Sequence, residues 1–294
     1  MSGRPPSQHA GLRGGTASLV VCVCIALIGT EAWQSHQVYQ DNIARNQVVT
    51  LNTARSMAEQ AETTLVTADT IVASLVERVE AEGTGTEART RLYHLMTSLA
   101  AALPAIHEMG IMDSHGNAIV KSLVAHPEGM NYAEREYFRY HATHPDRGPL
   151  LGERIKSKVD GTINVTITRR INNADGSFGG VVVTSVALNF FQHLFDQVQA
   201  KSGGIISLFG DDGTFLVRSP PVPFEAAGRA IAGSGELRPQ LHRLPEFGLV
   251  TYTSALDGVR RSGAYSHLSG FPLTVLVAQS DWDIQSSWRT DLRS

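Results

Sequence analysis

Two segments of the chain, residues 111–122 and 208–219, share one design. Each reads as a strand, a turn around a glycine and a second strand (IMDSHGNAIVKS and LFGDDGTFLVRS), with a basic residue and a final serine at matching positions. A strand rich in β-branched residues follows later in each case, at 180–186 and 273–278. Repetition on this scale predicts a duplicated structural unit. We therefore expect two tandem antiparallel-sheet modules with accompanying helices, in the α+β class.

The first module contains a further pair of strands, preceded by an aromatic and basic segment. Residues 162–170 and 178–186 show strand-like alternation, and Asp175-Gly176 between them is a strong hairpin signal. The preceding segment holds Tyr132, Arg135, Tyr137, Phe138 and Tyr140. Such a segment can form a lid over a small-molecule pocket, because aromatic rings bury apolar area and arginine binds carboxylates. The alternative is that the aromatic residues are core and Arg135 is a surface charge.

An apolar run lies near the N-terminus. Residues 17–29 (ASLVVCVCIALIG) carry no charge, and extension to residues 14–33 gives about twenty residues, the length that crosses a bilayer. Arg4 and Arg13 precede the run, which places residues 1–13 in the cytoplasm. We predict a transmembrane signal anchor at residues 14–33 and a single-pass protein of the inner (cell) membrane.

A cleaved signal peptide is the competing interpretation of this run, since its apolar centre is short. Glu31 and the bulky Trp33 make a poor processing site, which favours an uncleaved anchor. Under either interpretation the rest of the chain is exported, so we expect it in the periplasm.

A long amphipathic pattern follows the apolar run. Between residues 51 and 82 apolar side chains recur at alternating steps of three and four without Gly or Pro, which predicts a helix with a heptad seam. We assign residues 34–82 to one long stalk helix. A seam shows burial but not the partner, so the helix packs on its own chain, on a second copy in a homodimer, or on both. The seam residues are Leu51, Ala54, Ala58, Ala61, Leu65, Ala68, Val72, Leu75 and Val79.

Three shorter helices are also expected. Residues 86–103 form a helical pattern that ends at Pro104, and residues 188–200 carry an apolar stripe. Asp281 is a plausible N-cap for a C-terminal helix at residues 281–294, which would lead toward a second transmembrane segment that the sequence does not include.

Composition argues against several classes of function. The net charge is −3, with 25 Lys and Arg against 28 Asp and Glu, and no long basic block occurs, so nucleic-acid binding is not expected. His141 and His144 lack the accompanying carboxylate pattern of a zinc motif. Neither a Gly-x-Ser-x-Gly elbow nor a Gly-Lys-Ser phosphate loop is present. We expect no catalytic residues, no metal ion and no cofactor, and hence not an enzyme.

The order of these elements resembles the double Cache (PDC) sensor family of bacterial chemoreceptors, histidine kinases and diguanylate cyclases. The resemblance extends over residues 33–290 and is sharpest at residues 135–138 (REYF), 175–181 (DGSFGGV) and 210–213 (GDDG). It is closest to the sensors that precede diguanylate cyclase (GGDEF) or histidine kinase outputs. The resemblance implies a long helix that supports two PAS-like modules, of which the one farther from the membrane usually holds the ligand. We place the membrane-distal module at 83–200 and the membrane-proximal module at 201–280.

The resemblance also suggests binding residues. Family members that bind amino acids hold the carboxylate with an arginine, a spacer and two aromatic residues, and Arg135, Tyr137 and Phe138 stand at those places. Their upstream tyrosine corresponds to Met130, and their amine-binding aspartate falls near Ser185. A hydroxyl in place of that aspartate favours a carboxylate without an amine, such as an organic acid, or another small polar molecule. The expected ligand-binding residues are Arg135, Tyr137, Phe138, Tyr132, His141, Lys156, Arg169 and Ser185.

The positive charge near this site has two interpretations. Lys156 and Arg169 can add positive potential beside the ligand. Strand alternation could instead leave Arg169 on the outer face of the sheet.

Three functions are consistent with the sequence. The favoured one is the small-molecule sensing region of a membrane-bound bacterial receptor, which signals across the membrane by a ligand-driven population shift. The second is a non-catalytic dimerisation or protein-interaction scaffold with no small ligand. The third is a membrane-anchored hydrolase or metal protein that uses His141 and His144.

Overall fold

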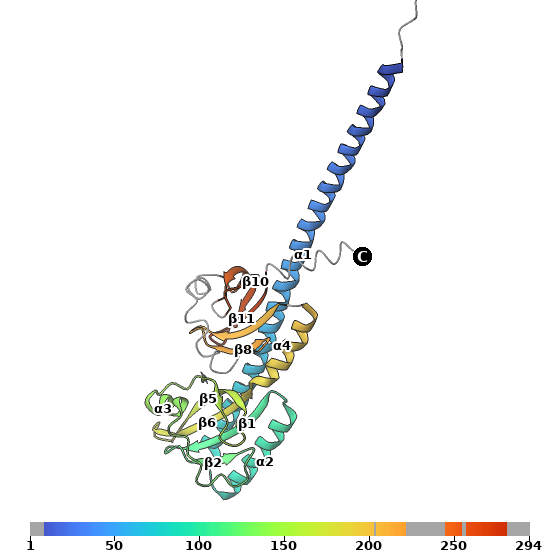
Figure 1. Cartoon of the computed structure of the whole chain (residues 1–294). Helices are drawn as coiled ribbons and strands as arrows, with labels where there is room; N and C mark the ends of the chain where they lie inside the picture. The colour runs from blue at the N-terminus through green and yellow to red at the C-terminus, as the bar shows by residue number, and fades with distance from the viewer. Residues whose placement is uncertain (1–8, 203, 222–244, 255–256, 281–294) are drawn as a thin grey trace, which may run out of the picture. The chain divides into compact units, whose positions relative to one another are not determined.

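The computed structural model describes residues 9–202, 204–221, 245–254 and 257–280, without the side chains of 9–25, 32, 39 and 200–202. Two antiparallel sheets and a long N-terminal helix make up the α+β fold, as expected (Figure 1). Residues 50–287 form one compact unit, and residues 1–49 belong to a separate one. The predicted C-terminal helix at 281–294 lies outside the described residues.

The long helix α1 (His9–Glu82) has an apolar seam along its second half. Ala54, Ala61, Leu65, Ala68 and Val72 are all fully buried, in one core cluster with residues of both sheets. Full burial of a leucine or valine side chain contributes about 1.5–3 kcal/mol, so this packing is a main source of stability. The seam between residues 54 and 79 therefore packs on the chain's own body, as one of the alternatives predicted.

The first part of α1 includes the predicted membrane anchor. Residues 14–33 are helical, and the side chains of 14–25 are not described. Within the part of the chain that the structure describes, no helix combines the length and the hydropathy that a bilayer crossing needs.

The distal sheet has the strand order β2-β1-β6-β5-β3, with β4 also paired to β5. The predicted hairpin of residues 162–186 is present as β5 and β6, which turn at Gly176 with a φ of 81°. The elements of this module are α2 (Thr86–Ala102), β1 (Ile106–Asp113), β2 (Ala118–Lys121), α3 (Glu136–Thr143), β3 (Leu150–Leu151), β4 (Ile155–Lys156), β5 (Ile163–Asn172), β6 (Phe178–Ala187) and the following α4 (Leu188–Ser202).

The proximal sheet repeats the same arrangement in the order β8-β7-β11-β10-β9. In both sheets the predicted hairpin supplies the first two strands, and its first strand pairs with the last strand of the module, β6 or β11. The hairpin glycines, Gly116 and Gly213, have φ values of 83° and 87°, a left-handed conformation that glycine adopts without steric cost. The strands are β7 (Ile205–Gly210), β8 (Phe215–Ser219), β9 (Phe247–Thr253), β10 (Arg260–His267) and β11 (Leu273–Ser280).

The two faces of the distal sheet differ in character. On β5, Val165, Ile167 and Ile171 belong to the core cluster that includes α1. Because side chains alternate along a strand, the residues between them point to the other face. That face is covered by the segment that leads into α3, and several buried polar residues lie on it.

Three acidic residues of α1 attach the helix to both modules. Glu62 accepts hydrogen bonds from the backbone N–H groups of Ser269 and Gly270 in the turn between β10 and β11. Asp69 forms an ion pair with Arg169 of β5. Glu80 accepts from the backbone N–H of Asn172, at the end of β5.

Candidate ligand-binding site

The aromatic residues before and within α3 form a lid on the distal sheet. Tyr132, Tyr137 and Phe138 are buried in one apolar cluster with Met112 of β1 and with Val181 and Val183 of β6. The rings of Phe138 and Phe178 meet edge to face with their centroids 5.4 Å apart. Burial also raises the pKa of the Tyr137 phenol, which stays protonated. The lid residues are therefore packed as core between α3 and the sheet.

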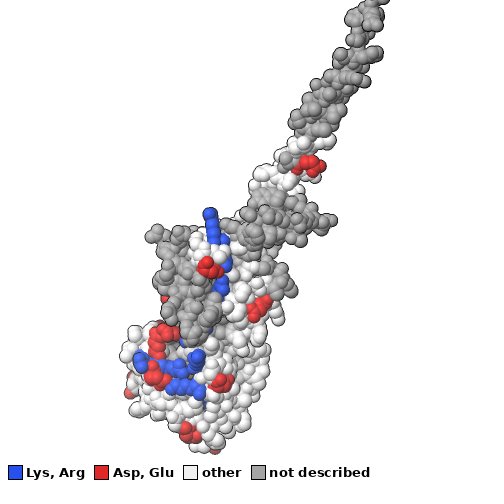
Figure 2. All heavy atoms as spheres, viewed as in Figure 1, with Lys and Arg blue, Asp and Glu red and all other residues white. Residues whose placement is uncertain are grey.

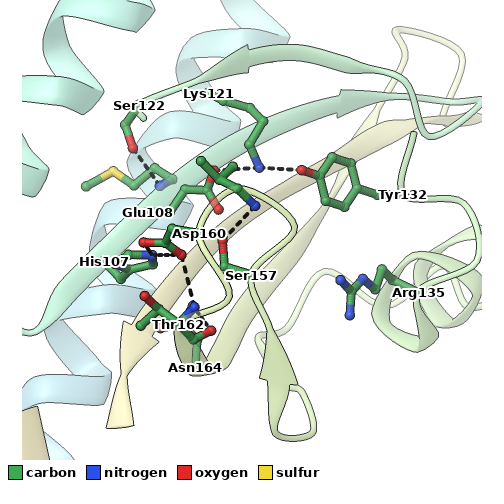
Figure 3. A network of polar contacts seen from close by, with 12 residues as sticks. His107, Glu108, Lys121, Ser122, Tyr132, Arg135, Ser157, Asp160, Thr162 and Asn164 are labelled. Carbon is green, nitrogen blue, oxygen red and sulfur yellow. Dashed lines mark hydrogen bonds and ion pairs between the residues drawn. The ribbon is translucent and has the colours of Figure 1, made fainter. Parts of the chain in front are cut away.

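Arg135 lies immediately before α3 and is mostly buried, with 20% of its side chain exposed. Its Nη2 donates to the backbone carbonyl of Lys156 at 3.1 Å, and its Nε lies 3.5 Å from Glu134 Oε1 without a hydrogen bond. In Figure 3 the guanidinium points away from α3, toward the segment of residues 157–162. Arg135 is thus held under the lid and is not a solvated surface charge.

A buried ion pair lies near this arginine (Figure 3). Lys121 Nζ is 2.6 Å from Glu108 Oε1 and donates to the Tyr132 hydroxyl at 2.8 Å. Lys158 Nζ is 4.8 Å from the centroid of the same tyrosine ring and is paired with Glu134. Tyr132 thus contacts two ammonium groups, a favourable arrangement for an aromatic ring.

A row of polar residues crosses the sheet beneath the lid. Glu108 on β1 is opposite Ser185 on β6, which is opposite Thr166 on β5. Thr166 Oγ1 and the nearby Asn164 Oδ1 are buried without hydrogen-bond partners. Each such atom costs about 1–3 kcal/mol unless it is satisfied, so these residues form a candidate site for a polar molecule.

The segment that borders this row is fixed in place. Gly152 N–H donates to the carbonyl of Thr166, and a Cβ at position 152 would meet Thr166 Oγ1. Asp160 Oδ1 accepts from Thr162 N–H at 3.0 Å, and its other oxygen is 3.1 Å from His107 Nε2 on β1 (Figure 3). These contacts hold the segments around Gly152 and Asp160 against the strands that carry the polar row.

Comparison with known proteins places this fold in a family. The family model dCache_1, a Cache domain, matches residues 34–288. The chain belongs to the Cache domain family. A search of curated protein sequences gives no match to this Cache protein.

Solved structures share the fold of this Cache protein. An extracellular domain assigned to a histidine kinase, rpHK1S-Z16, is 28% identical, with 84% of this chain and 99% of that one covered at a TM-score of 0.73. The ligand-binding domain of the Pseudomonas fluorescens chemoreceptor CtaA, in complex with L-serine, is 16% identical over 78% of this chain and 94% of that one, at a TM-score of 0.56. The ligand-binding domain of Mlp24 with asparagine is 13% identical over 85% of this chain and 98% of that one, at 0.60.

The Cache structure brings most of the predicted site residues together. Tyr132, Tyr137 and Phe138 form the lid, Arg135 lies at its edge, and Ser185 is in the polar row. Lys156 has an exposed side chain, and its contact with Arg135 is through its backbone carbonyl. Whether these groups bind a ligand remains a prediction.

His141 occupies a different environment from the one expected. It is a fully buried residue of α3, and its Nε2 lies 2.9 Å from Thr168 Oγ1 of β5. Burial lowers its pKa to about 4, so the ring is neutral at neutral pH. His144, the other histidine considered for zinc, is exposed and stacks on Tyr140 with ring centroids 4.2 Å apart.

Arg169 must be removed from the set of site residues. Its Nε and Nη2 donate to the two carboxylate oxygens of Asp69, and its Nη1 donates to the carbonyl of Arg147. The reason is the alternation of β5, because Arg169 shares the α1-facing side with Val165 and Ile167.

Two residues of the polar cluster were missed by sequence reasoning. Glu108 and Lys121 are a carboxylate and an ammonium on adjacent strands, both almost fully buried. The available signal was a charged residue inside the apolar strand HEMGIM, since charges are rarely buried unless paired.

A separate groove of about 530 Å³ lies between the two modules, and Arg135 is not among its lining residues. It is lined by residues 151–154 on one side and by residues 210–212, 214, 216 and 272–273 on the other. A hydrogen bond with Glu136 raises the pKa of the Glu153 carboxyl at its edge. On the face of the distal module that Figure 2 shows, Lys and Arg side chains gather in one group that is bordered by Asp and Glu.

Proposed function

We propose that this Cache protein is the extracytoplasmic ligand-binding region of a membrane-bound bacterial signal-transduction receptor. The observation that carries the proposal is the row Glu108, Ser185 and Thr166, a set of buried polar groups under an aromatic lid with Arg135 at its edge. Family membership supports it, as do similar structures described as an extracellular domain of a histidine kinase and as chemoreceptor domains with amino acids bound.

The ligand we propose is a small molecule with a carboxylate and no amine. Arg135 can hold a carboxylate with two parallel hydrogen bonds. An ammonium group needs an acceptor with uncompensated negative charge, and Glu108 already has Lys121 Nζ at 2.6 Å. Glu134 is likewise paired with Lys158. An organic acid therefore suits the charges of the cluster better than an α-amino acid.

Signalling is proposed to follow from a population shift. A ligand that binds better to one arrangement of lid and sheet shifts the equilibrium by its difference in affinity between the two states. Residues 14–33 would anchor the chain in the inner membrane, with residues 1–13 in the cytoplasm and residues 34–294 in the periplasm. A homodimer would then carry the change across the membrane.

The proposal is tested by a thermal-shift screen of small organic acids on the full chain in detergent. A ligand at one hundred times its Kd stabilises the folded state by about 2.7 kcal/mol, which gives a clear rise in Tm. Arg135→Ala should abolish the rise. Arg139→Ala removes an exposed arginine from α3, the helix that Arg135 precedes, and should leave the rise in Tm unchanged. The proposal fails if no acid stabilises the chain, or if the two variants respond equally.

A further inference from the structure

The proximal sheet has a polar cluster of its own. One of its faces packs on α1 through residues such as Ile206, Leu208 and Val275. The opposite face carries the apolar cluster that includes Phe209, Phe215 and Tyr252. Ser207 of β7 and Arg218 of β8 are register partners between these apolar positions. This face corresponds to the face of the distal sheet that carries the candidate site.

Arg218 is buried, with 9% of its side chain exposed. Its Nη1 donates to the carbonyl of Pro220 at 3.1 Å, and its Nη2 is 4.0 Å from Asp257 Oδ2. Its Nε is fully buried and has no hydrogen-bond partner. The same is true of the hydroxyl of Ser207, its partner across the strand pair. Two unsatisfied donors thus lie on adjacent strands.

The nearby carboxylate is already engaged. Asp257 accepts two hydrogen bonds from Arg261, Nη1 to Oδ1 and Nη2 to Oδ2, each 2.8 Å long. This pairing, with a backbone hydrogen bond from Val259, holds the pKa of Asp257 well below its usual range. Among the described residues, the ion pairs of this cluster contain one carboxylate for two guanidinium groups.

The carboxylate paired with Arg218 is therefore 4.0 Å away and already accepts two hydrogen bonds from Arg261. Burial lowers the pKa of the Arg218 guanidinium, and repulsion by Arg261 acts in the same direction more strongly than the attraction of Asp257 opposes it. A buried charge without full compensation is costly, and buried charges are normally paired. An anion beside Arg218 would supply both the missing charge and the missing hydrogen-bond acceptor.

The contact between Arg218 and Asp257 also defines the shape of this face. Arg218 stands on the edge strand β8, and Asp257 follows the opposite edge strand β9. Their contact joins the two edges over one face of the sheet. Across the sheet from Arg218, the register pairs Ser207 with Leu276 of β11 and Leu276 with Tyr265 of β10.

We infer that the proximal module contains a second binding site, for a small oxyanion held by Arg218 and Ser207. The fork of a guanidinium matches the oxygens of carboxylates and phosphates, and Ser207 supplies a further donor. Tyr252, whose pKa is raised to about 12 by burial, adds a protonated phenol on the same face. The site is separate from the one at Arg135 and does not depend on it.

The test is isothermal titration calorimetry on the full chain with acetate and with inorganic phosphate as probes. Both titrations use the Arg135→Ala background, so that binding at the proposed distal site does not contribute. One of the two anions should bind with a stoichiometry of one per chain. Binding of acetate would identify the ligand class as carboxylates, and binding of phosphate would identify it as phosphates. Loss of a hydrogen bond to a charged group weakens binding by about tenfold or more, so Arg218→Gln should have at least this effect.

Two further variants separate the site from general charge effects. Arg260→Gln removes an exposed charge from the same module and should leave the Kd within about twofold of the background, since exposed charges contribute little. Arg218→Lys keeps the charge and loses the fork of the guanidinium, so it should also weaken binding. This variant tests the site if Arg218→Gln does not fold. The inference is overturned if neither anion binds, or if Arg218→Gln and Arg260→Gln have the same effect. If Arg135→Ala has no effect in the thermal-shift screen, the proposed distal site fails. The anion binding expected at Arg218 in the calorimetry would be unaffected.

Discussion

Asp69 of α1 and Arg169 of β5 form a two-point ion pair, with Nε to Oδ1 at 2.6 Å and Nη2 to Oδ2 at 2.9 Å. The pair is about four-fifths buried on both sides, with 20% and 23% of the side chains exposed. It links the stalk helix to the strand that carries Thr166 on its other face. A movement of the polar row is therefore coupled to α1 through a single strand.

Removal of this ion pair should destabilise the fold. Asp69→Asn leaves the Arg169 guanidinium partly buried without its counterion, and we expect a loss of about 1–2 kcal/mol, between the values for surface and buried pairs. Urea denaturation at neutral pH measures the loss. Glu59→Gln, on an exposed position of the same helix, should change stability by less than about 0.5 kcal/mol. Equal effects of the two substitutions would contradict a specific role for Asp69.

Breaking the buried ion pair of Glu108 and Lys121 should destabilise the fold more than loss of the Asp69–Arg169 pair. Lys121→Met leaves a buried carboxylate without its partner, which typically costs about 3–5 kcal/mol. Lys158→Met removes the second ammonium group near Tyr132, but 36% of that side chain is exposed and the loss should be under about 1 kcal/mol. Denaturant unfolding of the two variants compares them directly. Addition of Glu108→Gln to Lys121→Met should recover part of the loss, and no recovery would argue against the pair.

His141 should make stability depend on pH. Its folded pKa of about 4 lies below the unfolded value of 6.5, so between these values the unfolded chain binds a proton that the folded chain does not. The free energy of unfolding should therefore fall as the pH decreases from 6.5 to 4, by up to about 3 kcal/mol from this group. His141→Gln should flatten this part of the profile. His144→Gln, which removes an exposed histidine nearby, should leave the slope as it is. A slope unaffected by His141→Gln would contradict this prediction.

The backbone at Gly152 should not tolerate a side chain. An added Cβ would meet Thr166 Oγ1, so Gly152→Ala should cost about 1–3 kcal/mol, the usual penalty of overpacking. Addition of Thr166→Ala removes the clashing atom and should restore most of the loss. If the double variant is no more stable than Gly152→Ala, the clash is not the cause.

Sequence patterns predicted much of the framework because they follow from local chemistry. The heptad seam of α1, the glycine turns at Gly116 and Gly213, and the hairpin at Gly176 all appear where periodicity and turn residues indicated them. The lid was also predicted, although the aromatic residues in it are as deeply packed as ordinary core.

The features that could not be predicted from the sequence depend on which face of each strand is covered and on how the strands pair. Alternation shows that Arg169 and Arg170 point in opposite directions, but it does not show which of them faces α1. The pairing of Glu108 with Lys121 depends on the register of β1 and β2, which includes an irregularity between Ile111 and Met112. A charged residue on one strand has no visible partner until that register is known.

The acidic residues Glu62, Asp69 and Glu80 lie along one helix and bind different modules, the first to the proximal turn and the other two to β5 and its end. A displacement of either module along α1 must therefore strain the attachments of that module to the helix. If each module binds its own small anion, both binding events act on the same helix.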